Sequence, residues 1–193
     1  MGMKGRANRQ RIVDAADHLF YARGYNQTSF SDISDQTGIP RGNFYYYFKT
    51  KEEILSAVVD ARVAIARATL DKLNKNASDP RQRLLSFARA PIENSDNIIR
   101  YGCPIGTLSS ELIKEQDQDI PKSRSTAVFD VFRDWCMQQF NALGFEQQAR
   151  LYAMDLLARL QGISVMANVY GDTDYIQHAS QDLQDWVMKI TSH

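Results

Sequence analysis

The residues best suited to binding chemistry lie in a short predicted helix that ends near Phe48. Phe44 and Phe48 are four residues apart, so they share one face of that helix, and we expect this face to be buried. Successive helical residues are about 100° apart, which places small and polar groups on the exposed side. Glycine there lets a DNA backbone come close, an asparagine amide can pair with adenine, and phenols reach phosphates or thymine methyl groups. The pattern predicts a DNA-binding face made of Gly42, Asn43, Tyr45 and Tyr46.

Two preceding helices are needed to position this face. Thr28 or Ser29 can cap a short helix, and Gly38 allows the sharp turn that a helix-turn-helix requires. Further upstream, residues 8–23 have an apolar face at helical spacing, and the glycine that follows favours a helix stop. The sequence therefore predicts a three-helix domain with a helix-turn-helix over residues 1–51.

Charge is unevenly distributed along the chain. The whole sequence has no formal net charge, but residues 1–51 hold eight basic and four acidic residues. A local positive excess is the electrostatic footprint of a nucleic-acid-binding segment, although an ordinary solvated surface would explain it equally well. The leading Lys4, Arg6 and Arg9 could reach a minor groove, but we expect a short disordered start at this terminus.

Several classes of protein are excluded by what the sequence lacks. No apolar run approaches the roughly 20 residues of a membrane span and no secretory signal opens the chain, so we expect a cytoplasmic protein. Cys103 and Cys136 form no disulfide framework or C-x-x-C motif, and the three histidines are scattered, so neither a metal site nor a cofactor is predicted. The sequence has no G-x-S-x-G elbow and no phosphate-binding glycine loop, and we expect no enzyme activity.

Helical periodicity continues through the rest of the chain, and strand-like alternation is nearly absent. The expected fold is all-α, with about nine helices. A capping box of Thr50 and Glu53 opens the fourth helix, and Asp79-Pro80 opens the fifth, which runs to about residue 93. Glycines and prolines make residues 94–106 look irregular. The remaining helices are expected in a second domain (residues 52–193), over 107–115, 121–144, 146–168 and 174–190.

The order and spacing of residues 28–53 resemble a known family. Thr-Ser-(x)3-Ile-(x)4-Gly-Ile-x-Arg-Gly-x-Phe-Tyr-Tyr-x-Phe-Lys-x-Lys-Glu-Glu is similar to the DNA-binding segment of the TetR/AcrR repressor family, and the likeness covers about residues 8–60. It implies that Arg41 joins the exposed face in or beside the major groove, and that Thr28 and Lys51 bind phosphates. Pro40 departs from the pattern, because many members have a serine or threonine cap there. The expected DNA-binding residues are Thr28, Ser29, Arg41, Gly42, Asn43, Tyr45, Tyr46 and Lys51.

The same resemblance implies a dimeric repressor that holds double-stranded operator DNA and releases it when a small-molecule inducer binds the C-terminal domain. Two recognition helices about 34–36 Å apart would match a near-palindromic operator. Dimerisation would use the last two helices, although an intramolecular core would explain their apolar stripes equally well. A ligand-independent DNA-binding regulator is an alternative. The residues assigned to the dimer interface are Leu151, Leu157, Gly162, Ile176, Leu183, Trp186 and Val187.

A second distinctive segment surrounds Cys103. Residues 101–112 resemble the Gly-Cys-Leu-x-x-x-Leu-x-x-Glu segment of one branch of the family, some of whose members sense electrophiles or oxidants through this cysteine. A helix N-terminus favours a thiolate, but no basic residue lies beside this thiol, and packing as a small apolar side chain is the alternative. Thiol sensing is therefore a second hypothesis. Because planar ligands stack on aromatic and thioether groups, the candidate pocket residues are Phe87, Tyr101, Cys103, Phe129, Phe132, Trp135, Tyr152 and Met166.

Overall fold

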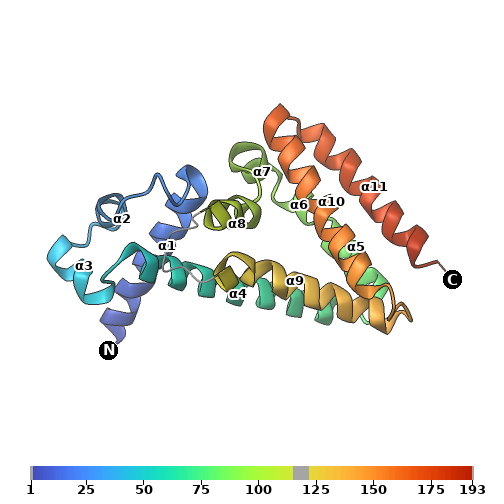
Figure 1. Cartoon of the computed structure of the whole chain (residues 1–193), viewed down its shortest axis with the longest axis horizontal. Coiled ribbons are helices and arrows are strands. Elements are labelled where there is room, and N and C mark those ends of the chain that lie inside the picture. The colour runs from blue at the N-terminus through green and yellow to red at the C-terminus, as the bar shows by residue number, and fades with distance from the viewer. Residues whose placement is uncertain (1, 115–121, 193) are drawn as a thin grey trace. The chain divides into compact units, whose positions relative to one another are not determined.

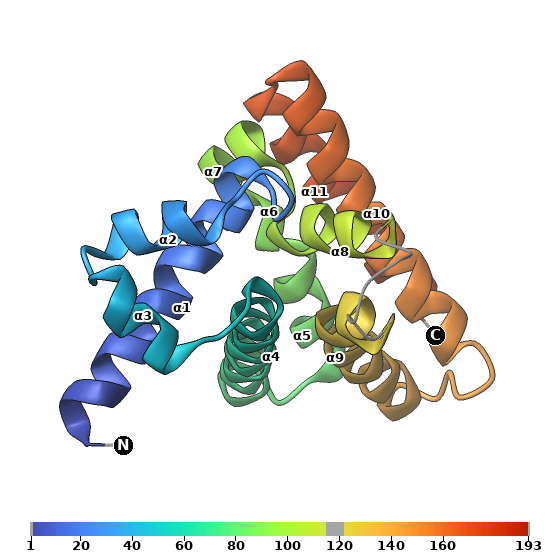
Figure 2. The same ribbon diagram turned by 60° about the vertical axis from the view of Figure 1, so that its left-hand side comes forward.

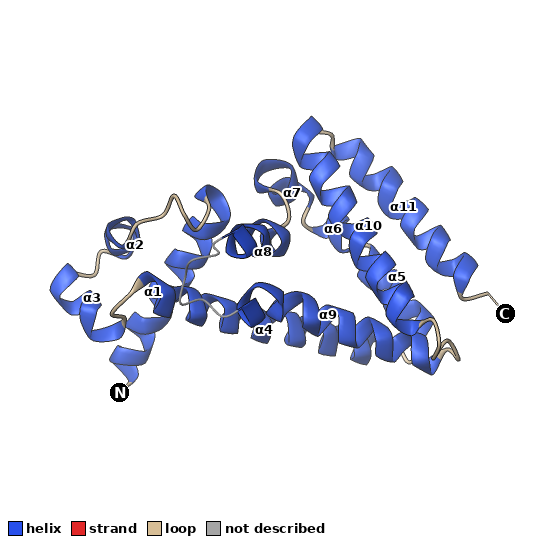
Figure 3. Cartoon of the chain, in the orientation of Figure 1, coloured by secondary structure: helices blue, strands red, loops and turns tan. Residues whose placement is uncertain are grey.

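The computed structural model describes residues 2–114 and 122–192, apart from the side chains of Arg41 and Lys122. Every regular element among these residues is a helix, which confirms the all-α class (Figures 1 and 3). None of these helices combines the length and hydropathy needed to cross a membrane. In chain order they are α1 (Met3–Arg23), α2 (Phe30–Thr37), α3 (Arg41–Tyr47), α4 (Lys51–Asn76), α5 (Pro80–Ala88), α6 (Ala90–Glu93), α7 (Ser95–Tyr101), α8 (Pro104–Lys114), α9 (Lys122–Ala142), α10 (Ala149–Tyr170) and α11 (Thr173–Ile190).

Packing divides the chain into two compact units. The first comprises residues 1–64 and 107–128, and the second comprises residues 65–106 and 129–193. The predicted boundary at residue 51 separates the helix-turn-helix domain from the second domain by their expected functions, and it stays a prediction. By packing, the first unit also includes the start of α4 and most of α8, because apolar residues of both helices join its core: Ile54, Leu55, Val58, Leu108 and Leu112.

Glycines and hydrogen-bonded caps set the helix ends of the first unit. Ser29 caps α2 in a reciprocal capping box with Asp32, and Gly38 ends that helix in the left-handed conformation, at φ 63°. At the start of α4, Thr50 Oγ1 accepts a hydrogen bond from the Glu53 N–H at 3.2 Å, as the expected cap requires. α2 packs against both α1 and α3 (Figure 2). The shared core includes Ile12, Ala16, Leu19, Phe20, Ile33, Phe44 and Phe48.

The second unit is organised around its last two helices. α10 and α11 lie side by side and are joined at Gly171, which adopts a left-handed conformation at φ 63° (Figures 1 and 2). α10 also packs against α7, and α11 against α5. The buried interior of this unit includes Leu84, Ile98, Trp135, Cys136, Phe140, Leu156, Leu160, Ile176, Leu183 and Val187.

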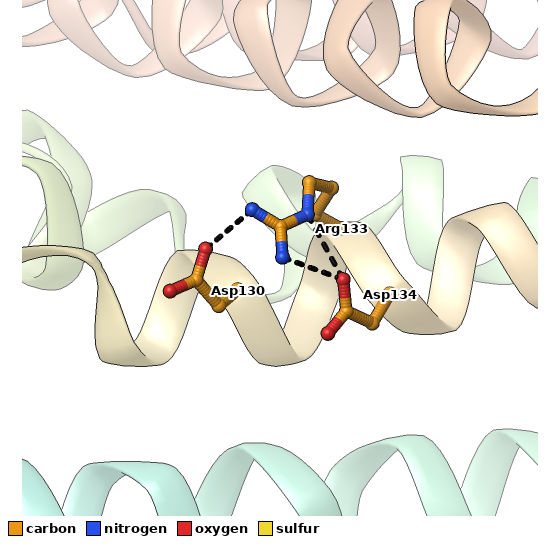
Figure 4. Close-up of polar contacts among 3 residues, drawn as sticks. All are labelled: Asp130, Arg133 and Asp134. Carbon is orange, nitrogen blue, oxygen red and sulfur yellow. Dashed lines mark hydrogen bonds and ion pairs between the residues drawn. The ribbon is translucent and has the colours of Figure 1, made fainter. Parts of the chain in front are cut away.

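α9 carries an exposed cluster of ion pairs in the second unit. The Arg133 guanidinium lies 2.6 Å from Asp130 and 2.7 Å from Asp134, as Figure 4 shows. The hydrogen bond to Asp134 is the main reason that the pKa of Arg133 is raised, and Asp130 acts in the same direction. Such exposed pairs contribute little to stability, so we assign this cluster to the solvated surface of α9.

Most of the segment expected to be irregular, residues 94–106, is helical instead. Residues 95–101 form α7, which ends at Gly102 with φ 78°. α8 begins at Pro104, three residues before the expected helix start at residue 107, because the first turn of a helix tolerates proline. The expected disordered start is also wrong, since α1 begins at Met3. The expected helix over residues 79–93 is divided at Arg89 into α5 and α6. The expected helix ends at Glu115 and Pro121 lie outside the described residues.

Candidate nucleic-acid interface

α3 is oriented by two buried phenylalanines. Phe44 is fully buried and Phe48 is 2% exposed, and the Phe44 ring meets Phe30 of α2 edge-on at 4.7 Å between centroids. The opposite face carries Gly42 and Asn43, both exposed. A Cβ on Gly42 would meet no heavy atom within 4 Å, so packing within the described part of the chain does not require glycine there. The burial pattern is the one expected from the sequence, and the outward face of α3 is open to a partner.

The two outward phenols of α3 are exposed but held in place. Tyr45 is 52% exposed and its ring stacks on Phe30 at 5.2 Å, while Tyr46 is 68% exposed and meets Tyr47 edge-on at the same distance. Tyr47 in turn accepts a hydrogen bond from Asn8 of α1 at 3.1 Å. Both rings are therefore positioned before any partner arrives, which reduces the entropy lost on binding.

The turn between α2 and α3 is held by buried polar groups that the sequence reasoning missed. Ser34 Oγ donates to the Ile39 carbonyl at 3.0 Å, and the Ile39 N–H donates to Thr37 Oγ1 at 3.2 Å. Arg11 of α1 donates to the Thr37 carbonyl at 2.7 Å. The two hydroxyl residues shortly before Gly38, at positions 34 and 37, were the available signal. These bonds fix the angle at which α3 leaves α2.

Thr28 has a structural role in place of the predicted phosphate contact. It is 1% exposed, its N–H donates to the Tyr25 carbonyl at 3.2 Å, and its hydroxyl donates to the Gly24 carbonyl at 2.8 Å. Both donors are therefore used inside the turn that precedes α2. Ser29 is exposed, but its hydroxyl donates to Asp32 at 2.6 Å as part of the cap. The side chain of Arg41 lies outside the described residues.

Lys51 lies at the start of α4, and its ammonium group contacts both the backbone carbonyl and the ring of Tyr25. Its Nζ donates to the Tyr25 carbonyl at 3.1 Å and lies 4.1 Å from the centre of the Tyr25 ring. The Tyr25 hydroxyl donates to Glu52 at 3.4 Å. Partial burial acts to raise the pKa of Glu52, but hydrogen bonds from its own N–H, Thr50 and Tyr25 lower it overall. The Lys51 ammonium group is therefore held in place in the same compact unit as α3.

Comparisons with known proteins agree with this geometry. Residues 12–58 match the bacterial regulatory proteins of the tetR family. The chain is 30% identical over 185 residues to an HTH-type transcriptional regulator encoded in the lacX 3′ region of Lactococcus lactis subsp. lactis, covering 89% of each protein. The chain belongs to the TetR family of transcriptional regulators. It carries a helix-turn-helix DNA-binding domain and is a regulator, not an enzyme, as expected.

Two further known proteins are similar to the chain, one in sequence and one in fold. The transcriptional repressor DhaR of Mycobacterium sp. strain GP1 is 30% identical over 128 residues, which cover 66% of this chain and 61% of DhaR. A TetR-family regulator from Streptomyces coelicolor has the same fold, with a TM-score of 0.80 over 96% of each chain and 19% sequence identity.

The candidate pocket residues of this TetR-family chain do not form one group. Phe87, Phe132 and Trp135 come together in the second unit, with the Phe87 ring 5.4 Å from each of the other two. Tyr152 instead packs against Phe140. Met166 is 41% exposed on α10, away from these ring contacts, and its place in a pocket stays a prediction. Phe129 and Tyr101 are half-buried. An open hollow of about 540 Å³ at the α10–α11 turn is lined by none of these side chains, but by residues 170–174.

Cys103 lies immediately before α8. Its Sγ accepts hydrogen bonds from the Gly106 N–H at 3.4 Å and from Gln161 Nε2 of α10 at 3.3 Å. Space beside the sulfur is limited, since a Cβ on Gly106 would lie 2.3 Å from Gln161 Oε1. Cys136, in contrast, is fully buried, and burial raises the pKa of its thiol.

Most residues assigned to the dimer interface lie in the core of the second unit. The structure buries Leu157, Ile176, Leu183 and Val187, as the alternative of an intramolecular core predicted, and Trp186 packs edge-on against Tyr152. Leu151 is 61% exposed, and Gly162 is also exposed. The predicted interface includes Leu151 and Gly162 of the outward face of α10, but not the other apolar residues of that outward stripe. The outward stripe of α10 contains Leu151, Met154, Val165, Met166, Val169 and Tyr170.

Proposed function

We propose that this TetR-family regulator is a repressor that binds a near-palindromic operator as a homodimer and leaves it when a small molecule binds the second unit. The observation that carries the proposal is the outward face of α3, where glycine, amide and phenol groups are exposed beside fully packed phenylalanines. Repression in particular is supported by the likeness to DhaR, which is named a repressor.

Each outward residue of α3 has a chemical role in this proposal. Asn43 offers an amide that can donate to and accept from an adenine edge, and Gly42 lets the helix approach the bases. Tyr45 and Tyr46 contact thymine methyl groups or phosphates, and Arg41 contacts guanine or phosphate. Lys51 and Ser29 lie at helix starts where the backbone attracts phosphate. The phosphate contacts give affinity, and the α3 contacts give sequence preference.

A second copy of the chain is the proposed occupant of the outward stripe of α10. Leu151, Met154, Val165 and Val169 are each at least 46% exposed, and they recur at helical spacing along one face. A Cβ on Gly162, in the middle of this stripe, would meet no heavy atom within 4 Å. A contiguous apolar face of this kind favours association, and a twofold axis would pair the stripe with itself.

The aromatic cluster of the second unit is the proposed inducer site. Phe87, Phe132 and Trp135 present flat apolar surfaces, and Trp135 Nε1 donates to Asn74 Oδ1 at 3.0 Å, which adds a polar group at the edge of the cluster. A ligand that favours a dimer geometry unsuited to DNA by about 1–3 kcal/mol would weaken operator binding by roughly five- to 150-fold. Release then needs a shift in population and no chemical step.

Thiol control through Cys103 is a second candidate function, favoured by the crowding around its sulfur. Two donors contact Sγ, and the Gln161 amide, which lies close to Gly106, would have to move to make room for added atoms. An adduct on the sulfur would break both hydrogen bonds and displace the first turn of α8. That helix continues to Leu108 and Glu111, which pack and hydrogen-bond within the DNA-binding unit.

Selection of random duplexes tests the main proposal directly. The selected sequences should share a near-palindrome, and Asn43→Ala should weaken binding to that sequence by about fivefold to 150-fold, the effect expected of one bidentate base contact. Asn141→Ala removes an exposed amide from α9 and is the matched control. Selection of sequences without shared bases, or equal effects in both variants, would overturn the proposal.

A further inference from the structure

We propose that the first two turns of α1 form a second DNA-contacting surface, in which Lys4 and Arg6 bind backbone phosphates that flank the bases read by α3. This inference rests on the proposed function and extends it. The surface is defined here as residues 3–9, the N-terminal arm of α1. Its occupant is the phosphate backbone of duplex DNA next to the operator.

The N-terminal arm is helical and is anchored beside α3. Asn8 Nδ2 donates to the Tyr47 hydroxyl at 3.1 Å, and the Arg9 guanidinium lies 4.8 Å from the centre of the Phe48 ring. Figures 1 and 2 both show these first turns of α1 extending past the end of α3. Any surface that α3 contacts therefore lies close to the arm, whose position is set by the same aromatic residues.

The arm contributes nothing to the core of its unit. The first buried residue of α1 is Ile12, and Met3, Lys4 and Arg6 are all exposed. Short helices without packing are marginal in water, so burial of apolar side chains does not explain these two further turns. Met3 is the only large apolar residue of the arm, which argues against a protein partner or a hydrophobic surface as its occupant.

The charge of the arm matches a polyanion. Lys4, Arg6 and Arg9 are followed by Arg11, and no acidic residue precedes Asp14. Arg6 and Arg9 are three residues apart on the helix, where like charges repel each other. Phosphates would relieve this repulsion.

Salt titrations on two duplexes test the inference. One duplex holds the minimal selected operator, and the other extends it by about eight base pairs at each end. The wild-type chain should bind the long duplex more tightly and with a steeper dependence on salt. Lys4→Ala/Arg6→Ala should remove most of this difference, and the slope of log K against log salt should fall by about 0.9 for each phosphate that the variant no longer neutralises. Each such phosphate accounts for a roughly three- to fourfold fall in affinity between about 50 and 200 mM salt.

Matched variants separate this surface from general charge and from the proposed function. Lys72→Ala/Lys75→Ala removes the same charge from exposed positions of α4 in the second unit and should leave both slopes unchanged. Charge reversal, Lys4→Glu/Arg6→Glu, should weaken binding to the long duplex further, while the circular dichroism melting curve stays as in wild type. Unchanged salt slopes in the arm variants, or equal effects on both duplexes, would overturn the inference. Failure of sequence-selective binding by the wild type would instead overturn the proposed function.

Discussion

The Glu111 carboxylate of α8 accepts a hydrogen bond from the Asn26 N–H, with Oε2 3.1 Å from the nitrogen. Its other oxygen occupies the space beside Gly24, where a Cβ would lie 2.8 Å from Oε1. Gly24 ends α1 at φ 91°, a conformation that L side chains rarely adopt. α8 therefore holds the turn that leads from α1 into the capped start of α2.

Removal of this carboxylate should loosen the turn. Glu111→Ala should lower the free energy of unfolding by about 1–2 kcal/mol, because the Asn26 N–H is left without its charged acceptor. Gly24→Ala should cost about 1–3 kcal/mol through backbone strain and contact with Glu111. Urea unfolding measures both. Glu111→Gln keeps an acceptor of the same size and should retain most of the stability. Equal destabilisation in the Ala and Gln variants would contradict the assigned role.

The recognition face was predictable because it depends on local geometry. Two phenylalanines four residues apart can only share one side of a short helix, so the exposure of Asn43 and Tyr46 followed from spacing alone. The caps at Ser29 and Thr50 were also local, since each hydroxyl accepts from a nitrogen three residues later.

Features that depend on distant residues were not predictable. Thr28 looks like an exposed cap in the sequence, but Gly24 and Tyr25 capture both of its donors. A helical apolar stripe does not show which partner covers it, so Ile176 and Leu183 were assigned to a dimer although they pack inside one chain. The contact of Glu111 with Asn26 joins residues 85 apart in the sequence, and no local pattern indicates it.

Substitutions on the buried face of α3 should lower stability, whereas substitutions on its exposed face should weaken DNA binding. Phe44→Ala leaves a cavity in a fully buried position and should cost about 3–5 kcal/mol of unfolding free energy. Tyr46→Ala, on the exposed face, should change stability by less than about 0.5 kcal/mol but weaken operator binding at least about fivefold. Chemical unfolding and fluorescence anisotropy with labelled operator measure the two effects. A stable Phe44→Ala protein, or full affinity in Tyr46→Ala, would refute the division of roles.

The proposed dimer should dissociate when charge is placed on the outward stripe of α10. Val165→Glu/Val169→Glu would bury two carboxylates of each chain at the contact and should raise the dimer dissociation constant at least about 100-fold. Sedimentation equilibrium measures this constant. Ile65→Glu alters another exposed aliphatic residue, 62% exposed on α4, and should leave the association unchanged. An unchanged dimer in the α10 variant would show that another surface mediates association.

The two cysteines should react very differently with a mild alkylating agent. Cys103 is half-buried, whereas Cys136 is fully buried and burial raises the pKa of its thiol, so Cys103 alone should be labelled in the folded chain. If the thiol controls DNA binding, labelling should release the operator, and Cys103→Ser should abolish that release. Mass spectrometry of peptides and gel shifts report the two events. Operator release that persists in Cys103→Ser would rule out the thiol hypothesis.

The capping box of α2 should make stability depend on pH in the acid range. Hydrogen bonds from the Ser29 hydroxyl and N–H lower the pKa of Asp32 below its ordinary value of 3.8, so folding favours the ionised carboxylate. The sign follows from linkage: this stabilisation is fully present above the ordinary pKa and is lost as the pH falls towards the lower pKa of the folded chain. Asp32→Asn should therefore flatten the stability curve in that window. Asp35→Asn removes a carboxylate from the same helix, and comparing the two variants by thermal melting between about pH 2.5 and about pH 6 isolates the capping carboxylate. If the acid slope of the Asp32→Asn curve equals that of the wild type, the cap does not hold an ionised carboxylate.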